Sequence, residues 1–291
     1  MRLQLFWSCL LVLLALPSVT SGQVADGGFM QSQNELPTDV QSDFGARQGS
    51  WYAYWGWHEA RFTRGDIRFR GAEYDFTLEK ARGVQRQRRF TVDGFLNPAT
   101  ATVPQFNFRI GWFVRNDVDL SIGLDHMKWV LEPYQSVAIT GTIAGTGTEH
   151  DGEYSGEQKQ VNYDWIAFEH TDGLNWFNVA IRKHQQLVDW RCFNLSAYEG
   201  ASIGIITPRT DATLFRGERH DKYRLAGYGI GGSIGLNLTV WRYVFLQAEL
   251  KGGLAHVPSA RTTPDPIDRA SHAFLFGQSV AAFGARWRLR R

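Results

Sequence analysis

The sequence has few of the features that indicate a disulfide-bonded, helical membrane or polyionic protein. Its 291 residues include only 2 cysteines. Cys9 lies in the N-terminal apolar stretch, so Cys192 stands alone in the remainder and an internal disulfide is excluded there. Past the N-terminus no apolar run approaches the roughly 18 residues of a membrane-spanning helix. The formal net charge of +2 excludes a nucleic-acid-binding polycation and an acidic tail protein.

Metal-binding and nucleotide-binding motifs are equally scarce. The 8 histidines are scattered, and no HxH, HExxH or DxDxDG pattern is present. Glu149, His150, Asp151 and Glu153 have a spacing that could hold a cation, although such a stretch is more typical of a solvated loop. The glycine-rich run 227–235 is not followed by a helix pattern, as a dinucleotide-binding loop would be. We therefore expect no metal and no cofactor.

Aromatic residues and glycine, by contrast, are abundant. The chain has 11 Trp, 10 Tyr and 19 Phe, together 14%, and 30 Gly. Its mean hydropathy is nevertheless −0.30. Alternating strands explain this combination, because successive side chains of a strand point to opposite faces. Phe106, Phe108 and Ile110, for example, alternate with Asn107 and Arg109.

The N-terminus predicts secretion. Arg2 precedes an apolar run that ends at Pro17, and small residues follow where a signal peptidase would cut. We interpret residues 1–22 as a signal peptide, since the run is shorter than the roughly 20 residues that a membrane anchor needs. Residues 23–50 are polar and are interpreted as a flexible periplasmic lead-in to a barrel domain over residues 51–291.

Eight segments of alternating hydrophobicity follow the lead-in. They are 51–64, 104–115, 119–131, 173–183, 198–208, 223–240, 244–253 and 272–290. The connections between them alternate in length, short at 116–118 and 241–243 and long at 65–103, 132–172, 209–222 and 254–271, with 184–197 departing mildly from the rule. Outer-membrane barrels show this alternation, because their periplasmic turns are short and their extracellular loops long. The pattern predicts an all-β, eight-stranded antiparallel transmembrane β-barrel with long extracellular loops and a periplasmic C-terminus.

The two faces of each strand are then assigned to lipid and to the barrel interior. A closed barrel pairs every backbone N–H and C=O group internally, as the hydrocarbon region requires. Aromatic residues gather at expected strand ends, where they would meet the lipid headgroups: Trp51, Tyr52, Tyr54, Trp55, Trp57, Trp241, Tyr243 and Trp287. A periplasmic β-sandwich or a lipocalin-like soluble barrel is the alternative, but its outer face would carry less Phe, Ile and Leu. In the first long connection, residues 73–78 are expected to extend a hairpin above the membrane.

These features resemble the small outer-membrane β-barrels of Gram-negative bacteria. That group includes the OmpA transmembrane domain, OmpX and the lipid A enzymes PagL and PagP, and the resemblance covers about residues 51–289. It implies a Gram-negative outer membrane after signal-peptide cleavage, contact with outer-membrane lipid and lipopolysaccharide, and insertion by the barrel assembly machinery. The chain ends in Trp287, Arg288, Leu289, Arg290 and Arg291, whereas such barrels usually end in an aromatic residue. Recognition of the last strand would have to use Trp287 or Leu289.

Charged residues on the inward faces predict a filled interior. An eight-stranded barrel has a lumen that side chains nearly fill. We expect a polar network of Arg109, Asp125, Glu249, Lys251 and Arg286 there, which argues against a wide pore. Function would then depend on the extracellular loops, either structural or through binding of a surface ligand or partner.

A catalytic role is the main alternative. Glu169, His170, Asp172 and His272 are candidates at the rim of the loops, because carboxylates and a histidine lie close together in FEHTDG (168–173). Ser271 precedes His272, but neighbours on a strand point to opposite faces and cannot form a hydrogen-bonded pair. The histidine and serine spacing of PagL is not found. We therefore assign no catalytic residue and favour a non-enzymatic protein over a lipid A deacylase or acyltransferase, or a narrow channel.

Overall fold

The computed structural model describes residues 46–86, 104–190 and 192–289. The predicted signal peptide, residues 1–22, and all but the end of the predicted lead-in, residues 23–50, lie outside these ranges. Within them, no helix is long and apolar enough to span a membrane.

Eight antiparallel strands form a closed ring. They are β1 (Ser50–Phe62), β5 (Phe106–Phe113), β6 (Val118–Leu131), β9 (Ile166–Trp190), β10 (Phe193–Leu214), β12 (Gly227–Val240), β13 (Val244–Arg261) and β14 (Arg269–Arg288). Each pairs with the next, and β1 closes the ring by pairing with β14 from Ser50↔Arg288 to Phe62↔Phe276. Closure leaves no open edge in this part of the sheet, which is what a bilayer requires. The predicted eight-stranded barrel is confirmed.

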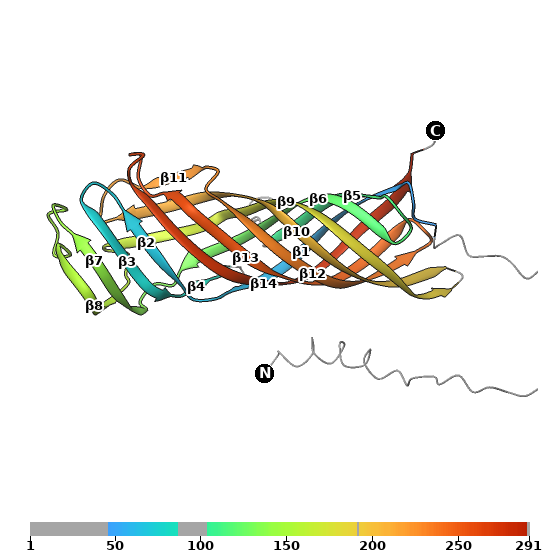
Figure 1. Ribbon diagram of the computed structural model, residues 1–291, viewed down its shortest axis with the longest axis horizontal. Helices are drawn as coiled ribbons and strands as arrows, with labels where there is room; N and C mark the ends of the chain where they lie inside the picture. The colour runs from blue at the N-terminus through green and yellow to red at the C-terminus, as the bar shows by residue number, and fades with distance from the viewer. Residues whose placement is uncertain (1–45, 87–103, 191, 290–291) are drawn as a thin grey trace, which may run out of the picture. The chain divides into compact units, whose positions relative to one another are not determined.

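Further strands continue the sheet beyond the ring. They are β2 (Gly65–Arg70), β3 (Tyr74–Ala81), β4 (Gly83–Val84), β7 (Ser136–Ile143), β8 (Gly152–Gln160) and β11 (His220–Tyr223). The first residues of β14 pair with β2, and the order continues β2, β3, β7, β8. Figure 1 shows β2, β3, β7, β8 and β11 gathered at one end of the barrel, while β14 ends at the other. We call the end that carries them extracellular and the end with the short turns periplasmic.

Wherever the structure describes them, the long connections predicted at this end contain further strands. Residues 132–172, 209–222 and 254–271 consist largely of strands, and so do the described residues of 65–103; residues 87–103 lie outside the described ranges. β2 and β3 form the hairpin that was expected above the membrane. The physical reason is an apolar core, in which Phe69, Leu78 and Ile139 are fully buried.

The 184–197 connection is a hairpin rather than a loop. β9 runs to Trp190 and β10 begins at Phe193, so both strands extend beyond the predicted boundaries at the periplasmic end. A β-bulge between Leu195 and Ser196 interrupts the register there. Polar residues such as Gln185 and Gln186 obscured the strand pattern, because the alternation that marks a half-buried strand weakens outside the membrane.

The outer wall of the ring is apolar. Large apolar side chains are exposed on it: Ile122 by 62%, Val179 by 54%, Ile203 by 59% and Ile234 by 60%. Such exposure is unfavourable in water and favourable in lipid. Trp51, Trp112, Trp241, Tyr243 and Trp287 mark the periplasmic margin, and Tyr228 marks the extracellular one. A closed barrel with an apolar outer wall and aromatic margins places this protein in an outer membrane.

Inward-facing glycines make room for large side chains in the lumen. A Cβ atom on Gly231 would lie 2.9 Å from the Trp176 ring, and one on Gly123 would lie 2.8 Å from the Arg109 guanidinium. Both distances are shorter than a carbon–carbon contact allows. The inward-facing glycines of the run 227–235 therefore serve packing, as expected from their place in an alternating strand.

Candidate functional site

The centre of the lumen is organised around the carboxylate of Asp125. Lys251 Nζ donates to both of its oxygens at 3.0 Å, and Asn178 Nδ2 donates to Oδ2 at 3.0 Å. Asn107 Nδ2 also donates to this carboxylate. The side chains of Lys251 and Asp125 are only 2% and 1% exposed. Ion pairing and hydrogen bonds together offset the cost of removing these two charges from water.

Glu249 and Arg109 extend this group, which we call the central layer. Lys251 Nζ lies 3.4 Å from Glu249 Oε1, and the Tyr198 hydroxyl donates to Glu249 Oε2 at 2.8 Å. Arg109 donates to three neutral groups instead of a carboxylate: Asn178 Oδ1 at 2.7 Å, Ser121 Oγ at 3.0 Å and the Tyr54 hydroxyl at 3.2 Å. Four of the five predicted lumen residues thus meet in one hydrogen-bonded group.

Arg286 lies elsewhere. It is eight positions further along β14 than Gln278, the residue that pairs with Lys251. Its Nη2 donates to the Arg242 carbonyl oxygen at 3.3 Å at the periplasmic end. Arg286 lies on the inward face of β14, as the alternation predicts. It lies closer to the periplasmic end than the central layer does.

A second ionic group lies between the central layer and the periplasmic end. Asp119 accepts hydrogen bonds from the Tyr52 hydroxyl at 2.6 Å, from Arg182 Nε at 3.1 Å and from His184 Nε2 at 2.5 Å. The Arg182 guanidinium carbon also lies 4.9 Å from the centre of the Tyr198 ring, within cation–π range. None of these residues was predicted for the lumen. Asp119 could have been predicted from the sequence, because it is an even number of positions from Asp125 on β6 and so lies on the same inward face.

The extracellular part of the lumen is filled by apolar side chains. Met127, Leu174 and Trp176 are fully buried there. They belong to one cluster with Phe69 and Ile139 of the extracellular strands, and we call it the apolar layer. The barrel and the extracellular sheet therefore share a single continuous core.

Two catalytic candidates, His170 and His272, meet inside the apolar layer. Their Nε2 atoms are 3.3 Å apart, and the two residues are 0% and 4% exposed. Trp129 packs against both rings, at centroid distances of 5.6 and 4.8 Å. Two imidazoles buried among aromatic rings are shielded from solvent, so this pair is interpreted as a packing contact.

The two acidic candidates lie apart from these histidines. Glu169 Oε2 accepts from Arg86 Nη1 at 2.8 Å, and Asp172 Oδ2 accepts from Arg209 Nη1 at 2.7 Å. Among the described residues, no serine hydroxyl or carboxylate hydrogen-bonds to either imidazole. Acyl transfer needs a nucleophile, a base and an orienting acid in mutual contact. The described residues around His170 and His272 do not form such a group.

The acidic stretch 149–153 runs from a turn into β8. The His150 ring stacks on Trp165 with centroids 5.2 Å apart, while the Asp151 carboxylate accepts from the Thr146 hydroxyl at 2.5 Å. Burial against the aromatic ring lowers the pKa of His150. In the described ranges, no three His, Cys, Asp or Glu side chains are placed to hold a metal ion.

The outer wall of the extracellular sheet carries arginines in adjacent strands. Arg261 of β13 pairs with Arg269 of β14, which pairs with Arg70 of β2. We call these three residues the arginine row. Arg70 Nε lies 3.5 Å from an oxygen of Asp75, a carboxylate whose pKa is held below its ordinary value by its hydrogen bond to Arg68. Within the described ranges, Arg261 and Arg269 make no ion pair, and their side chains donate to backbone carbonyl groups.

Comparison with known proteins gives matches of architecture alone. No protein-family model and no curated protein matches this sequence. Among solved structures, the chain is similar to Ail of Yersinia pestis, with 10% identity, a TM-score of 0.31, and coverage of 82% of this chain and 99% of that one. Neisserial surface protein A is 11% identical, with a TM-score of 0.34 and coverage of 82% and 99%. The outer membrane protein OprG of Pseudomonas aeruginosa is 9% identical, with a TM-score of 0.38 and coverage of 84% and 98%.

Proposed function

We propose that this protein is a non-enzymatic outer-membrane barrel that binds phosphate groups of lipopolysaccharide on its extracellular wall. The observation that carries the proposal is the arginine row. Three arginines lie in register on neighbouring strands, and only Arg70 has a carboxylate, that of Asp75, beside it. Like charges in direct register are unfavourable unless an anion screens them. Guanidinium groups match phosphate geometry in bidentate hydrogen bonds.

The position of the row suits the lipid headgroups. Arg261 lies five positions beyond His256 on β13, and His256 hydrogen-bonds the Tyr228 hydroxyl at the aromatic margin. The row therefore lies on the water side of that margin, which supports contact with phosphorylated headgroups. Burial lowers the pKa of His220, and the charges of Arg224, Arg261 and Lys222 act in the same direction, so further positive charge lies nearby.

The filled lumen supports a binding role over transport. The central layer and the apolar layer occupy successive levels of the barrel with side chains that contact one another. Insertion by the barrel assembly machinery is part of the same proposal. Trp287, which is 38% exposed, and Leu289 are the apolar residues near the end of β14 that it would contact.

Titration of the purified barrel with lipopolysaccharide tests the proposal. The Arg261→Gln, Arg269→Gln double variant should bind about tenfold more weakly, because two charge-assisted contacts are lost. Arg219→Gln is the matched control, since the Arg219 side chain is 62% exposed but is already paired with Asp211 at 2.5 Å. Dephosphorylated lipopolysaccharide and free inorganic phosphate are the other two arms. Equal affinity for the phosphorylated and dephosphorylated lipid, or equal weakening in the control variant, would contradict the proposal.

The same preparation tests the two alternatives. Acyl chains of the lipopolysaccharide should be unchanged by mass spectrometry after incubation, and the barrel should show no conductance in planar bilayers. Released acyl chains would support a lipid-modifying enzyme, and discrete current steps would support a narrow channel.

A further inference from the structure

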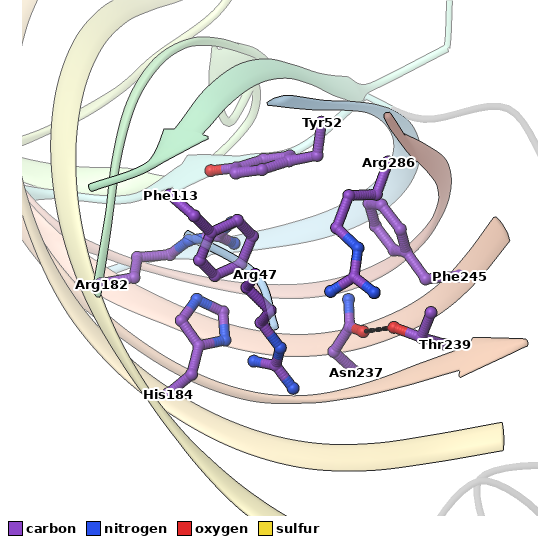
Figure 2. Close-up of a pocket in the computed structure, with 9 residues that line it drawn as sticks. All are labelled: Arg47, Tyr52, Phe113, Arg182, His184, Asn237, Thr239, Phe245 and Arg286. Atoms are coloured by element: carbon purple, nitrogen blue, oxygen red, sulfur yellow. Dashed lines mark hydrogen bonds between the residues drawn. The ribbon is translucent and has the colours of Figure 1, made fainter. Parts of the chain in front are cut away.

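We propose that the periplasmic mouth of the barrel holds a small inorganic anion of the size of chloride. The site is a cavity lined by basic side chains from distant parts of the chain (Figure 2). Arg47 precedes β1, Arg182 and His184 lie on β9, and Arg286 lies on β14. We call this cavity the mouth pocket.

The positive groups of the mouth pocket exceed the nearby carboxylates. Asp119 pairs with Arg182 and with His184, and Asp189 is the other carboxylate that acts on Arg47. Arg47 Nη2 donates to the neutral Asn194 Oδ1 at 2.8 Å. Arg286 donates to a backbone carbonyl, as described above. Among the described residues, three guanidinium groups thus face two carboxylates, an excess of one positive charge.

A buried donor without an acceptor lines the same pocket. The Arg182 side chain is 4% exposed, and its Nη1 has no hydrogen-bond partner among the described residues. A buried guanidinium N–H without an acceptor is unfavourable, because the group has lost its water and gained nothing in exchange. An anion in the pocket would supply the missing acceptor and the missing negative charge together.

The size of the pocket selects the class of anion. Its volume is about 20 Å³, enough for one water molecule or one monatomic anion. The excess positive charge favours chloride over water, since an ion interacts with a fixed charge more strongly than a neutral dipole does.

A bound anion would hold the start of the barrel in place. Arg47 belongs to the segment that leads into β1, and Figure 2 shows its side chain beside His184, with Arg286 pointing toward Asn237. One anion between Arg47, Arg182 and Arg286 would connect this segment to β9 and β14. Anion binding should therefore stabilise the folded barrel, because ligands that bind only the folded state raise its stability.

Thermal unfolding in detergent at constant ionic strength tests the inference. Sodium chloride and sodium bromide should raise the unfolding midpoint in a saturable manner, relative to sodium gluconate, whose anion is too large for the pocket. Arg286→Gln should raise the half-saturating chloride concentration about tenfold or more. Arg115→Gln is the matched control, because Arg115 lies at the same end but is 74% exposed and faces Asp117.

A second variant guards against a folding defect in the first. Asn237→Asp places a fixed carboxylate in the mouth pocket, so the protein should fold and its midpoint should no longer respond to chloride. Equal midpoints in chloride and gluconate for the native protein would overturn the inference and assign the cavity to water. An unchanged chloride response in Asn237→Asp would also overturn it, because the anion would then bind elsewhere.

Discussion

At the scale of single residues, the lumen depends on how completely each charge is paired. Asp125 receives hydrogen bonds from Lys251, Asn107 and Asn178, whereas Glu249 receives one from Tyr198 and a longer contact from Lys251. Removing Asp125 leaves an ammonium group with one distant partner. Removing Glu249 leaves the shorter ion pair, between Lys251 and Asp125, in place. The two carboxylates are therefore unequal in their importance for stability.

Asp125→Ala should lower the free energy of unfolding by about 3–5 kcal/mol, as expected when one partner of a buried pair is removed. Glu249→Ala should cost less, and the Glu249→Ala, Lys251→Ala double variant should lose less than the sum of its two single variants. Urea unfolding in detergent, followed by gel mobility, measures these values. The exposed control Arg219→Ala should cost under about 1 kcal/mol. If Asp125→Ala, Glu249→Ala and the double variant each lower the free energy of unfolding no more than this control does, the lumen is hydrated.

At the scale of the strand, β12 shows how alternation separates two solvents. Gly231 faces the lumen, where a Cβ atom would meet the Trp176 ring at 2.9 Å and the Gly252 carbonyl oxygen at 3.0 Å. Gly232 faces the membrane, where the nearest atom would be the Gly200 carbonyl oxygen at 3.7 Å. Neighbouring glycines on one strand thus have opposite tolerances for a side chain.

Gly231→Ala should destabilise the barrel by about 1–3 kcal/mol, because the lumen has no space for the added methyl group. Gly232→Ala should be neutral or slightly stabilising, since alanine costs less conformational entropy than glycine and its methyl group meets lipid. Each variant is the control for the other, as they differ by one position and by face. The same urea assay compares them, and a larger loss for Gly232→Ala would reverse the assignment of faces on β12.

At the scale of the whole barrel, closure makes the sheet resistant to mild denaturation. β1 and β14 pair over their entire common length, so every strand of the ring has two neighbours. The apolar layer adds a core that continues into the extracellular sheet. Local opening of one strand would break hydrogen bonds on both sides and expose part of this core.

The folded barrel should therefore resist sodium dodecyl sulfate at room temperature and migrate faster on a gel before boiling than after it. The comparison needs one purified sample divided in two, with only the heating step different. Gly231→Ala should lose the faster band at a lower temperature than the native protein does. Identical migration of the heated and unheated samples would count against a closed ring.

Much of this architecture could be predicted because its signal is local. Alternation with a period of two follows from the geometry of the strand itself, so Arg109, Asp125 and Lys251 could be assigned inward from the sequence alone. The number of ring strands and the parity of Arg286 follow from the same pattern. The ends of the strands do not, because strands that leave the membrane keep their hydrogen bonds while their outer faces become polar.

The partners of each lumen residue were decided only by the tertiary structure. Asp125 and Lys251 are 126 positions apart, and their contact depends on the register with which β6, β9 and the later strands close the ring. The same registers bring Arg47 to the mouth pocket and His170 to His272, and they leave Arg286 below the central layer. Alternation determines the face on which a side chain lies, whereas its height in the barrel depends on the shear of all eight strands together, which no local pattern contains.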